Sequence, residues 1–216
     1  MSGATQEYPG AEPFLPARRT IPALSKAVRD CQGCDLYRDA TQAVFGEGAR
    51  DASLVLVGEQ PGDVEDREGE PFVGPAGRVL DQALGEIGLT RDEVWVTNAV
   101  KHFRFTQQGK RRMHEGPSRW HVAACQPWLL AELDAVRPQG IVTLGATAGQ
   151  SLFGSGFRVG ASRGRVLDPL EGREEWVVAT IHPSAVLRGK ERRDELYAGL
   201  VADLRVAHDA LGAGRR

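Results

Sequence analysis

Four short apolar runs, each followed by a turn or a polar residue, constrain the fold of this chain more than any other feature. The first reads Leu54-Val55-Leu56-Val57 and leads into Gly58. An uninterrupted apolar run of this length is typical of a parallel strand that is buried on both faces. Similar runs occupy residues 94–98, 141–145 and 175–180. Amphipathic segments that predict helices alternate with these strands, at residues 74–87, 118–136, 146–153 and 194–211.

Strands that alternate with helices along the whole chain predict an α/β fold with three layers, α/β/α, around a mainly parallel central sheet. The length of 216 residues is enough for one domain with a proper core, which we expect to span residues 21–211. Residues 1–20 are rich in proline, glycine and charge and predict a flexible N-terminal tail. Pro127 lies inside the helix that opens near Ser118, where it predicts a kink or a break.

The charge balance excludes a generally basic, nucleic-acid-coating protein. The chain has 27 Lys and Arg against 29 Asp and Glu, which gives a net charge of −2. A nucleic-acid partner would therefore have to be met by a local basic patch. No apolar run approaches the length of a membrane span and no signal peptide is evident, so we expect a cytoplasmic protein without a membrane partner, most simply a monomer.

One segment, residues 101–114, has the composition of such a local patch. It holds five basic residues, two phenylalanines and two histidines, and the first acid after it is Glu115. We interpret it as a surface loop whose charge and interleaved rings suit a polyanion with flat bases. The simpler alternative is a solvated charged loop without a role. Its last residue, His114, follows three cations, which should disfavour protonation and leave a neutral, nucleophilic imidazole.

Polar residues follow several of the predicted strands, and in a parallel sheet the carboxyl ends of the strands meet at one edge. A carboxylate at Glu59 can orient a water or polarise a histidine, and the amide of Asn98 can read the edge of a base. His182 can donate to developing negative charge, and Phe72 can stack on a base or simply cover the core. Taken singly, each has a plain structural alternative, such as a solvated loop acid or a strand-ending asparagine.

The three cysteines point to a bound metal rather than to disulfides. Cys31 and Cys34 form a C-x2-C pair, Cys125 stands alone, and no secretory signal precedes them. The pair follows an amphipathic stretch rather than a strand, which disfavours a thioredoxin-like redox motif. With His102 the three cysteines would make a set of four ligands. Cys3His suits structural zinc, and histidine can also replace a thiolate on an iron–sulfur cluster, so spacing alone leaves both open.

Four motifs in this order resemble the uracil-DNA glycosylase superfamily and most closely its iron–sulfur family 4, over about residues 24–205. They are Gly58-Glu59-Gln60-Pro61-Gly62, Pro71-Phe72-Val73-Gly74-Pro75-Ala76-Gly77, Thr97-Asn98-Ala99-Val100-Lys101 and His182-Pro183-Ser184. Family 4 commonly has alanine where this chain has Gln60, and cysteine where it has His102. Both departures, together with the insertion Lys110-Arg111-Arg112-Met113-His114, resemble the UdgX class, although that class usually has isoleucine at the position of Met113.

The resemblance implies an enzyme that flips uracil out of DNA, excises it and then forms a covalent adduct between His114 and C1′ of the abasic site. It implies a catalytic group of His114, Glu59 and His182, and uracil binding by Gly58, Gln60, Gly62, Asp63, Phe72 and Asn98. It further implies DNA phosphate contacts from Lys101, Arg111, Arg112 and Arg188, and a [4Fe–4S] cluster held by Cys31, Cys34, His102 and Cys125.

Two other functions stay open at this point. One is a conventional turnover iron–sulfur uracil-DNA glycosylase that releases the abasic DNA, with His114 only touching phosphate. The other is a non-catalytic, cluster-bearing module that binds DNA or senses damage. The expected partner is uracil-containing DNA in each enzymatic case, and single-stranded DNA should be preferred because flipping a base out of a duplex costs a few kcal/mol.

Overall fold

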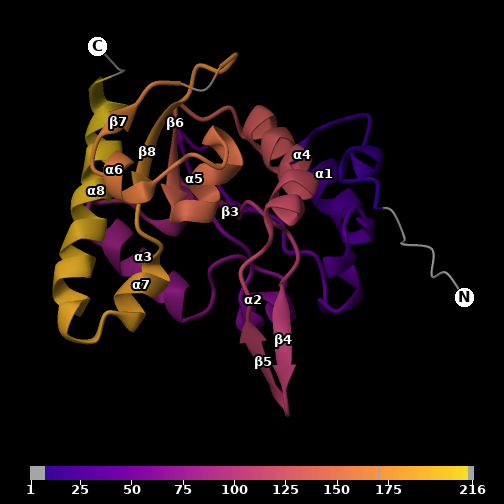
Figure 1. Ribbon diagram of the computed structural model, residues 1–216. Coiled ribbons are helices and arrows are strands. Elements are labelled where there is room, and N and C mark those ends of the chain that lie inside the picture. Colours follow the sequence, from indigo (N-terminus) through magenta and orange to yellow (C-terminus); the bar gives the residue numbers. More distant parts are fainter. Residues whose placement is uncertain (1–7, 170, 214–216) are drawn as a thin grey trace, which may run out of the picture.

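A six-stranded sheet forms the centre of the computed structural model, which describes residues 8–169 and 171–213 (Figure 1). The strand order is β1-β3-β2-β6-β8-β7. Its four inner strands are parallel, with Gly58 opposite Asn98 and Leu144 opposite Thr180 near their carboxyl ends. The inner strands are β2 (Leu54–Gly58), β3 (Trp95–Asn98), β6 (Gly140–Leu144) and β8 (Trp176–Thr180).

Two short antiparallel strands close the edges of the sheet. They are β1 (Glu47–Gly48) beside β3 and β7 (Val166–Leu167) beside β8. Each has two residues, too few for any periodicity to appear in the sequence, and neither was predicted. Short edge strands leave few unpaired backbone groups, which limits pairing with other chains.

Helices cover both faces of the sheet. One face carries α1 (Ile21–Ala27), α4 (Arg119–Val136) and α5 (Ala146–Phe153), and the other carries α3 (Pro75–Glu86), α7 (Pro183–Arg188) and α8 (Arg193–Ala213). Two more helices are α2 (Asp63–Glu68) and α6 (Val159–Ser162). Single 3-10 turns lie at Glu12–Phe14, Val28–Asp30, Asp35–Arg38, Arg91–Glu93 and Lys190–Arg192.

Alternate side chains of each inner strand enter two separate cores. Val55 and Val57 of β2 pack with α4, whereas Leu54 and Leu56 pack with α3 and α8. All four are at most 1% exposed. This is why the run Leu54–Val57 is apolar at every position, and it confirms the predicted three-layer α/β/α fold with a mainly parallel sheet.

Three expectations need correction. Residues 101–114 do not form an open loop, because β4 (Phe105–Gln108) and β5 (Arg111–His114) pair as a hairpin. Helix α4 runs unbroken through Pro127. The N-terminal segment expected to be a flexible tail is packed near Ala11, which is 1% exposed and whose N–H donates to the carbonyl of Ala124 at 2.8 Å. Residues 1–7 of that expected tail lie outside the described part.

The carboxyl ends of the inner strands face one edge of the molecule, where α2, α7 and the hairpin β4–β5 lie (Figure 1). Within residues 8–169 and 171–213, no helix combines the length and apolar character that crossing a bilayer requires.

Candidate active site

Asn98, at the carboxyl end of β3, forms the floor of the candidate site. Its side chain is 2% exposed, and its Oδ1 has no hydrogen-bond partner within the described residues. A Cβ on Gly58, the neighbouring strand end, would lie 2.3 Å from that oxygen. The absence of a side chain at Gly58 therefore leaves room for the side chain of Asn98 and the ring of Phe72. A buried amide oxygen without a partner is costly, which is expected where a ligand supplies the missing donor.

Phe72 and His182 lie beside Asn98. The ring of Phe72 is stacked on that of His182 with centroids 5.8 Å apart, and its Cζ would be 2.5 Å from a Cβ on Gly58. Phe72 comes from the loop between α2 and α3, and His182 follows β8. The tertiary structure thus brings together three of the residues that the strand-end argument selected.

The hydrogen bonds of His182 define its tautomer. Its Nδ1 accepts the backbone N–H of Ser184 at 3.1 Å and lies 2.8 Å from Ser184 Oγ. Burial, with smaller contributions from Arg188 and His114, lowers the pKa of His182 to about 4. The ring is therefore neutral at pH 7, with its proton on Nε2, and offers an N–H donor to a ligand.

His114, at the end of β5, lies at the rim of the site with 51% of its side chain exposed. The amide nitrogen of Gln60 is 3.0 Å from His114 Nε2. The orientation of that amide is fixed, because its oxygen accepts the N–H of Arg104 and its nitrogen donates to the carbonyls of Arg104 and Glu115. Both hydrogens of that amide are thus used on backbone carbonyls, and its nitrogen lies against His114 Nε2.

Glu59 stands next to His114 without a hydrogen bond between them. Its Oε1 is 3.6 Å from His114 Nε2, and its Oε2 accepts the hydroxyl of Thr147 from α5. A carboxylate at this distance would attract a positive charge on the ring and would leave the lone pair of a neutral ring free.

Gln60 and Asp63 were expected to bind the base, and their side chains have other partners. Gln60 is 6% exposed, and its amide forms hydrogen bonds with the backbone of Arg104 and Glu115 at the base of the hairpin. The carboxylate of Asp63 accepts Arg112 Nε at 2.5 Å and pairs with Arg67 at 3.1 Å. Gly62 precedes α2, and a Cβ there would lie 2.6 Å from Glu65 Oε2. These residues hold the loop and the hairpin rather than present polar side chains to a base.

Arg112 was expected to meet DNA phosphates, and in the structure its guanidinium is paired with acids. Its guanidinium pairs with Asp63 and, at 2.6 Å, with the buried carboxylate of Asp66, and its side chain is 12% exposed. It also lies over the rings of Phe103 and Phe105, 5.5 and 5.0 Å from their centroids. The interleaved rings of this segment therefore pack on Arg112. Together these contacts fasten the hairpin to α2.

Lys101 was also expected to meet phosphate, and the structure places it inside the protein. Its side chain is 1% exposed and forms an ion pair with the buried Glu132. Its Nζ also donates to Thr97 Oγ1 at 2.8 Å and to the carbonyl of Asn98 at 2.7 Å. Since every donor is satisfied internally, Lys101 fixes the end of β3 beneath the candidate site.

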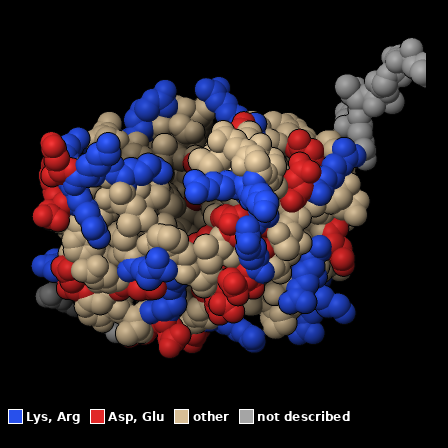
Figure 2. All heavy atoms as spheres, turned by 90° about the horizontal axis from the view of Figure 1, so that it is seen from below, with Lys and Arg blue, Asp and Glu red and all other residues tan. Residues whose placement is uncertain are grey.

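Arg111 and Arg188 are exposed, as a phosphate contact requires. Arg111 follows the turn of the hairpin, and Arg188 ends α7 close enough to His182 to lower its pKa. Figure 2 views the molecule from this side and shows Lys and Arg side chains around a hollow, with acidic groups beside it. This face therefore carries exposed cations interspersed with acidic groups.

The three cysteines are buried and close enough to influence one another's charge. Burial is the main cause that raises the pKa of Cys34 to about 11 and of Cys125 to about 12, and Cys31 adds to both. Trp128 Nε1 donates to Cys31 Sγ at 3.2 Å, and the N–H of Lys101 donates to Cys125 Sγ at 3.3 Å. Burial lowers the pKa of His102 to about 4, so its ring is neutral.

Within residues 8–169 and 171–213, no three His, Cys, Asp or Glu side chains lie in a geometry ready for a metal ion. The donor set still has the chemistry that a metal or cluster prefers, with three buried thiols and a neutral imidazole. Buried thiolates are unfavourable without a compensating positive charge, which a metal centre supplies.

Sequence reasoning missed the partners that hold the site. Thr147, Asp66, Glu132 and Ser184 each bind a predicted site residue, and each comes from a different element. Only Ser184 carried a signal, because it lies two residues after His182. The other three pairs join residues between 31 and 88 positions apart.

Comparison with known proteins agrees with this arrangement. Residues 45–205 match the Uracil DNA glycosylase superfamily. The chain is similar to the Type-4 uracil-DNA glycosylase of Thermotoga maritima, with 38% identity over 85% of this chain and 91% of the relative. It is also similar to the Type-4 enzyme of Archaeoglobus fulgidus, with 36% identity over 79% of this chain and 84% of the relative. The chain therefore belongs to the uracil-DNA glycosylase superfamily.

Proposed function

We propose that this protein is a DNA repair enzyme that excises uracil from DNA and then traps the abasic site covalently through His114. The buried, unpartnered Oδ1 of Asn98, next to the stacked rings of Phe72 and His182, carries the first part of the proposal. Similarity to two Type-4 uracil-DNA glycosylases supports it.

Recognition of uracil follows from the chemistry of Asn98. The N3–H of uracil can donate to Oδ1, and O4 can accept from the Asn98 amide nitrogen. Cytosine presents the opposite pattern, an acceptor at N3 and a donor at N4, so it would leave both groups mismatched. Phe72 would stack on the ring, and its edge together with the Gly58–Gly62 loop would exclude the 5-methyl group of thymine.

Cleavage of the glycosidic bond leaves its electron pair on uracil and a positive charge on the sugar. The Nε2–H of His182 would donate to a uracil oxygen as negative charge develops there. Because this donor is neutral, half-buried and fixed through Ser184, it requires no rearrangement during the reaction, which is the condition for efficient electrostatic stabilisation.

Trapping uses the lone pair on His114 Nε2, which would form a bond to C1′ after uracil leaves. The ring becomes a cationic imidazolium that keeps its Nδ1–H, and the departed uracil anion takes a proton from solvent. Glu59, held by Thr147, would stabilise the new positive charge. A fixed nucleophile can have an effective concentration of about 10⁵ M or more, so His114 should outcompete water.

We further propose that Cys31, Cys34, His102 and Cys125 hold a [4Fe–4S] cluster. When bound, the cluster would act structurally and balance the charge of the three thiolates. Its ligands join the N-terminal segment to α4 and to the start of the hairpin. Uracil-containing DNA, with single strands preferred and Arg111 and Arg188 on its phosphates, would be the partner of a monomer.

The test is incubation of the protein with single-stranded DNA that contains one uracil, followed by a denaturing gel and measurement of free uracil. We expect free uracil together with a protein–DNA band that survives heat and detergent. Free uracil without that band would support a turnover glycosylase instead. Absence of both would leave only a binding module.

A further inference from the structure

Phe72 has a backbone conformation that a bulky residue rarely adopts. Its φ is +57°, in the left-handed region, which is strained for a bulky L-residue. Such a conformation persists only where neighbouring groups hold it in place. Close packing on one side contributes, because a Cβ on Gly77 would lie 1.5 Å from the carbonyl oxygen of Phe72.

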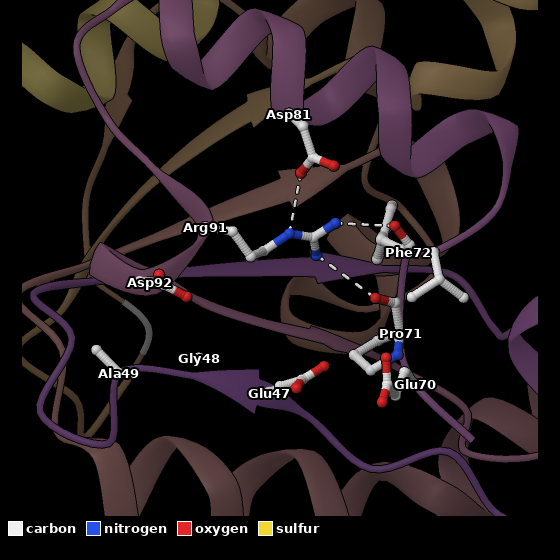
Figure 3. A pocket seen from close by; sticks show the side chains of 10 residues that line it. Glu47, Gly48, Ala49, Glu70, Pro71, Phe72, Asp81, Arg91 and Asp92 are labelled. Carbon is white, nitrogen blue, oxygen red and sulfur yellow. Dashed lines mark hydrogen bonds and ion pairs between the residues drawn. The ribbon is translucent and has the colours of Figure 1, made fainter. Parts of the chain in front are cut away.

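Arg91 holds this backbone from the other side, at the edge of a cavity of about 650 Å³ (Figure 3). It enters from the turn Arg91–Glu93 that precedes β3. Its Nη2 donates to the carbonyl of Phe72 at 2.8 Å and its Nη1 approaches that of Pro71 at 3.4 Å. Its Nε donates to Asp81 Oδ1 on α3 at 2.9 Å. All three nitrogen atoms of the guanidinium group are thus engaged at once.

The side chain of Phe72, in contrast to its carbonyl group, lies in the candidate active site. The Phe72 side chain is 4% exposed and is confined between His182 and Gly58. A backbone rotation at residue 72 would therefore move the ring relative to Asn98 and His182. Arg91 itself is on the far side of the loop, where it lines the solvent-filled cavity and not the site.

We propose that Arg91 is a positioning residue for uracil excision, which fixes the Phe72 ring by clamping the carbonyls of Pro71 and Phe72. The inference rests on the proposed role of Phe72 in stacking on uracil. The ion pair with Asp81 is half exposed and contributes little to stability by itself. Its importance is geometric, because the rigid fork of the arginine binds two carbonyls and a carboxylate in fixed directions.

The first test is a double-mutant cycle on single-turnover uracil release, measured against protein concentration. We expect Arg91→Gln to lower the maximal excision rate by roughly ten- to a hundredfold, because small misplacements of a positioning group have effects of this size. Phe72→Ala should also lower it. In the Phe72→Ala background, Arg91→Gln should change the rate by less than about twofold, since no ring remains to be positioned. Arg50→Gln, an exposed arginine before β2, is the matched control and should leave the rate unchanged.

The second test is chemical rescue of Arg91→Ala. The cavity is open to solvent, so methylguanidinium can enter the space of the lost side chain. It should restore several-fold of the excision rate, whereas methylammonium or sodium chloride at equal ionic strength should not. The melting temperature of each variant, read in parallel, separates a loss of folding from a loss of positioning.

Four outcomes overturn the inference. An unchanged rate in Arg91→Gln, while Phe72→Ala is impaired, would show that the clamp is dispensable. Equal losses from Arg91→Gln in both backgrounds, or failure of rescue in a folded Arg91→Ala, would show a general structural role. If Phe72→Ala itself kept the full rate, the fault would lie in the proposed role of Phe72, and the positioning inference would fall with it.

Discussion

The floor and the rim of the candidate site are built in different ways. The floor consists of Asn98 and Phe72, which are buried, and His182, which is half-buried. The sheet and its loops hold all three in place. The rim is the hairpin that carries His114, whose side chain is half exposed and which is fastened to α2 through the ion pairs of Arg112. Because floor and rim are held by different contacts, the two proposed steps, excision of uracil and covalent trapping, should be separable by mutation. In the proposed mechanism, bond cleavage would depend on the floor, and covalent trapping would depend on the rim, which ion pairs hold in place.

Removal of the proposed nucleophile should give the largest effect on the reaction, and it tests most directly whether floor and rim act in separate steps. His114→Ala should abolish the covalent adduct and leave a slower, residual release of uracil, with water attacking C1′ in place of the imidazole. The loss of an effective concentration of about 10⁵ M is far larger than any other effect predicted here. A denaturing gel and a free-uracil assay on the same reaction distinguish the two steps.

Two other results for His114→Ala would be informative. Loss of both adduct and uracil release would mean that the rim also drives departure of the base, and the separation of floor and rim would fail. An adduct as strong as in the unaltered protein would refute His114 and require another nucleophile. The neighbouring Met113→Ala, also exposed on β5, is a suitable control for damage to the hairpin.

The free energy of unfolding should depend on pH because His182 in the floor is shielded from solvent. The pKa of His182 is about 4 in the folded protein, below its ordinary value of 6.5. Between these two pH values the unfolded chain binds the additional proton, so the free energy of unfolding should fall as pH drops from 6.5 to 4. The upper limit for His182 alone is roughly 3 kcal/mol. Urea unfolding across this range would measure it. His182→Asn should reduce the dependence by about half, because His102, whose pKa is also lowered to about 4, contributes in the same pH range, and the same change at the more exposed His208 should not reduce it.

Asn98→Ala should lower uracil release by a factor that corresponds to about 1–3 kcal/mol, the usual contribution of a matched base-edge contact. Adduct formation should fall in parallel, because trapping follows excision. Single-turnover rates on one uracil-containing strand provide the measurement. A wild-type rate would show that the unpartnered oxygen of Asn98 is not the uracil contact.

Weakening the attachment of the hairpin to α2 should have the smallest effect and should reduce covalent trapping alone. Arg112→Gln removes the ion pairs with Asp63 and Asp66 and leaves the floor untouched. We expect the ratio of adduct to free uracil to fall by roughly tenfold, an amount that fits the loss of a partly buried ion pair. Arg111→Gln, the exposed neighbour, should instead weaken DNA binding without changing the ratio. Equal ratios in both variants would contradict the distinction between the two arginines.

The sequence by itself determined the layers of this protein. Runs such as Leu54–Val57 are apolar at every position, and only a strand covered on both faces accounts for that pattern. It also placed Asn98 and His182 at the strand ends that meet on one edge, and it identified the superfamily through four short motifs. These features are local in the chain, and local patterns can be read without knowledge of distant contacts.

The partners of the charged residues could be identified only from the three-dimensional structure. Lys101 and Arg112 appeared as phosphate contacts, because a cation in a basic segment has no visible partner in the sequence. Their partners, Glu132 and Asp66, lie 31 and 46 positions away. The segment folds as a hairpin because Gly109, with φ of +58°, allows a two-residue turn between Gln108 and Arg111. Whether a charge faces solvent or an acid depends on such long-range pairing, which no local pattern encodes.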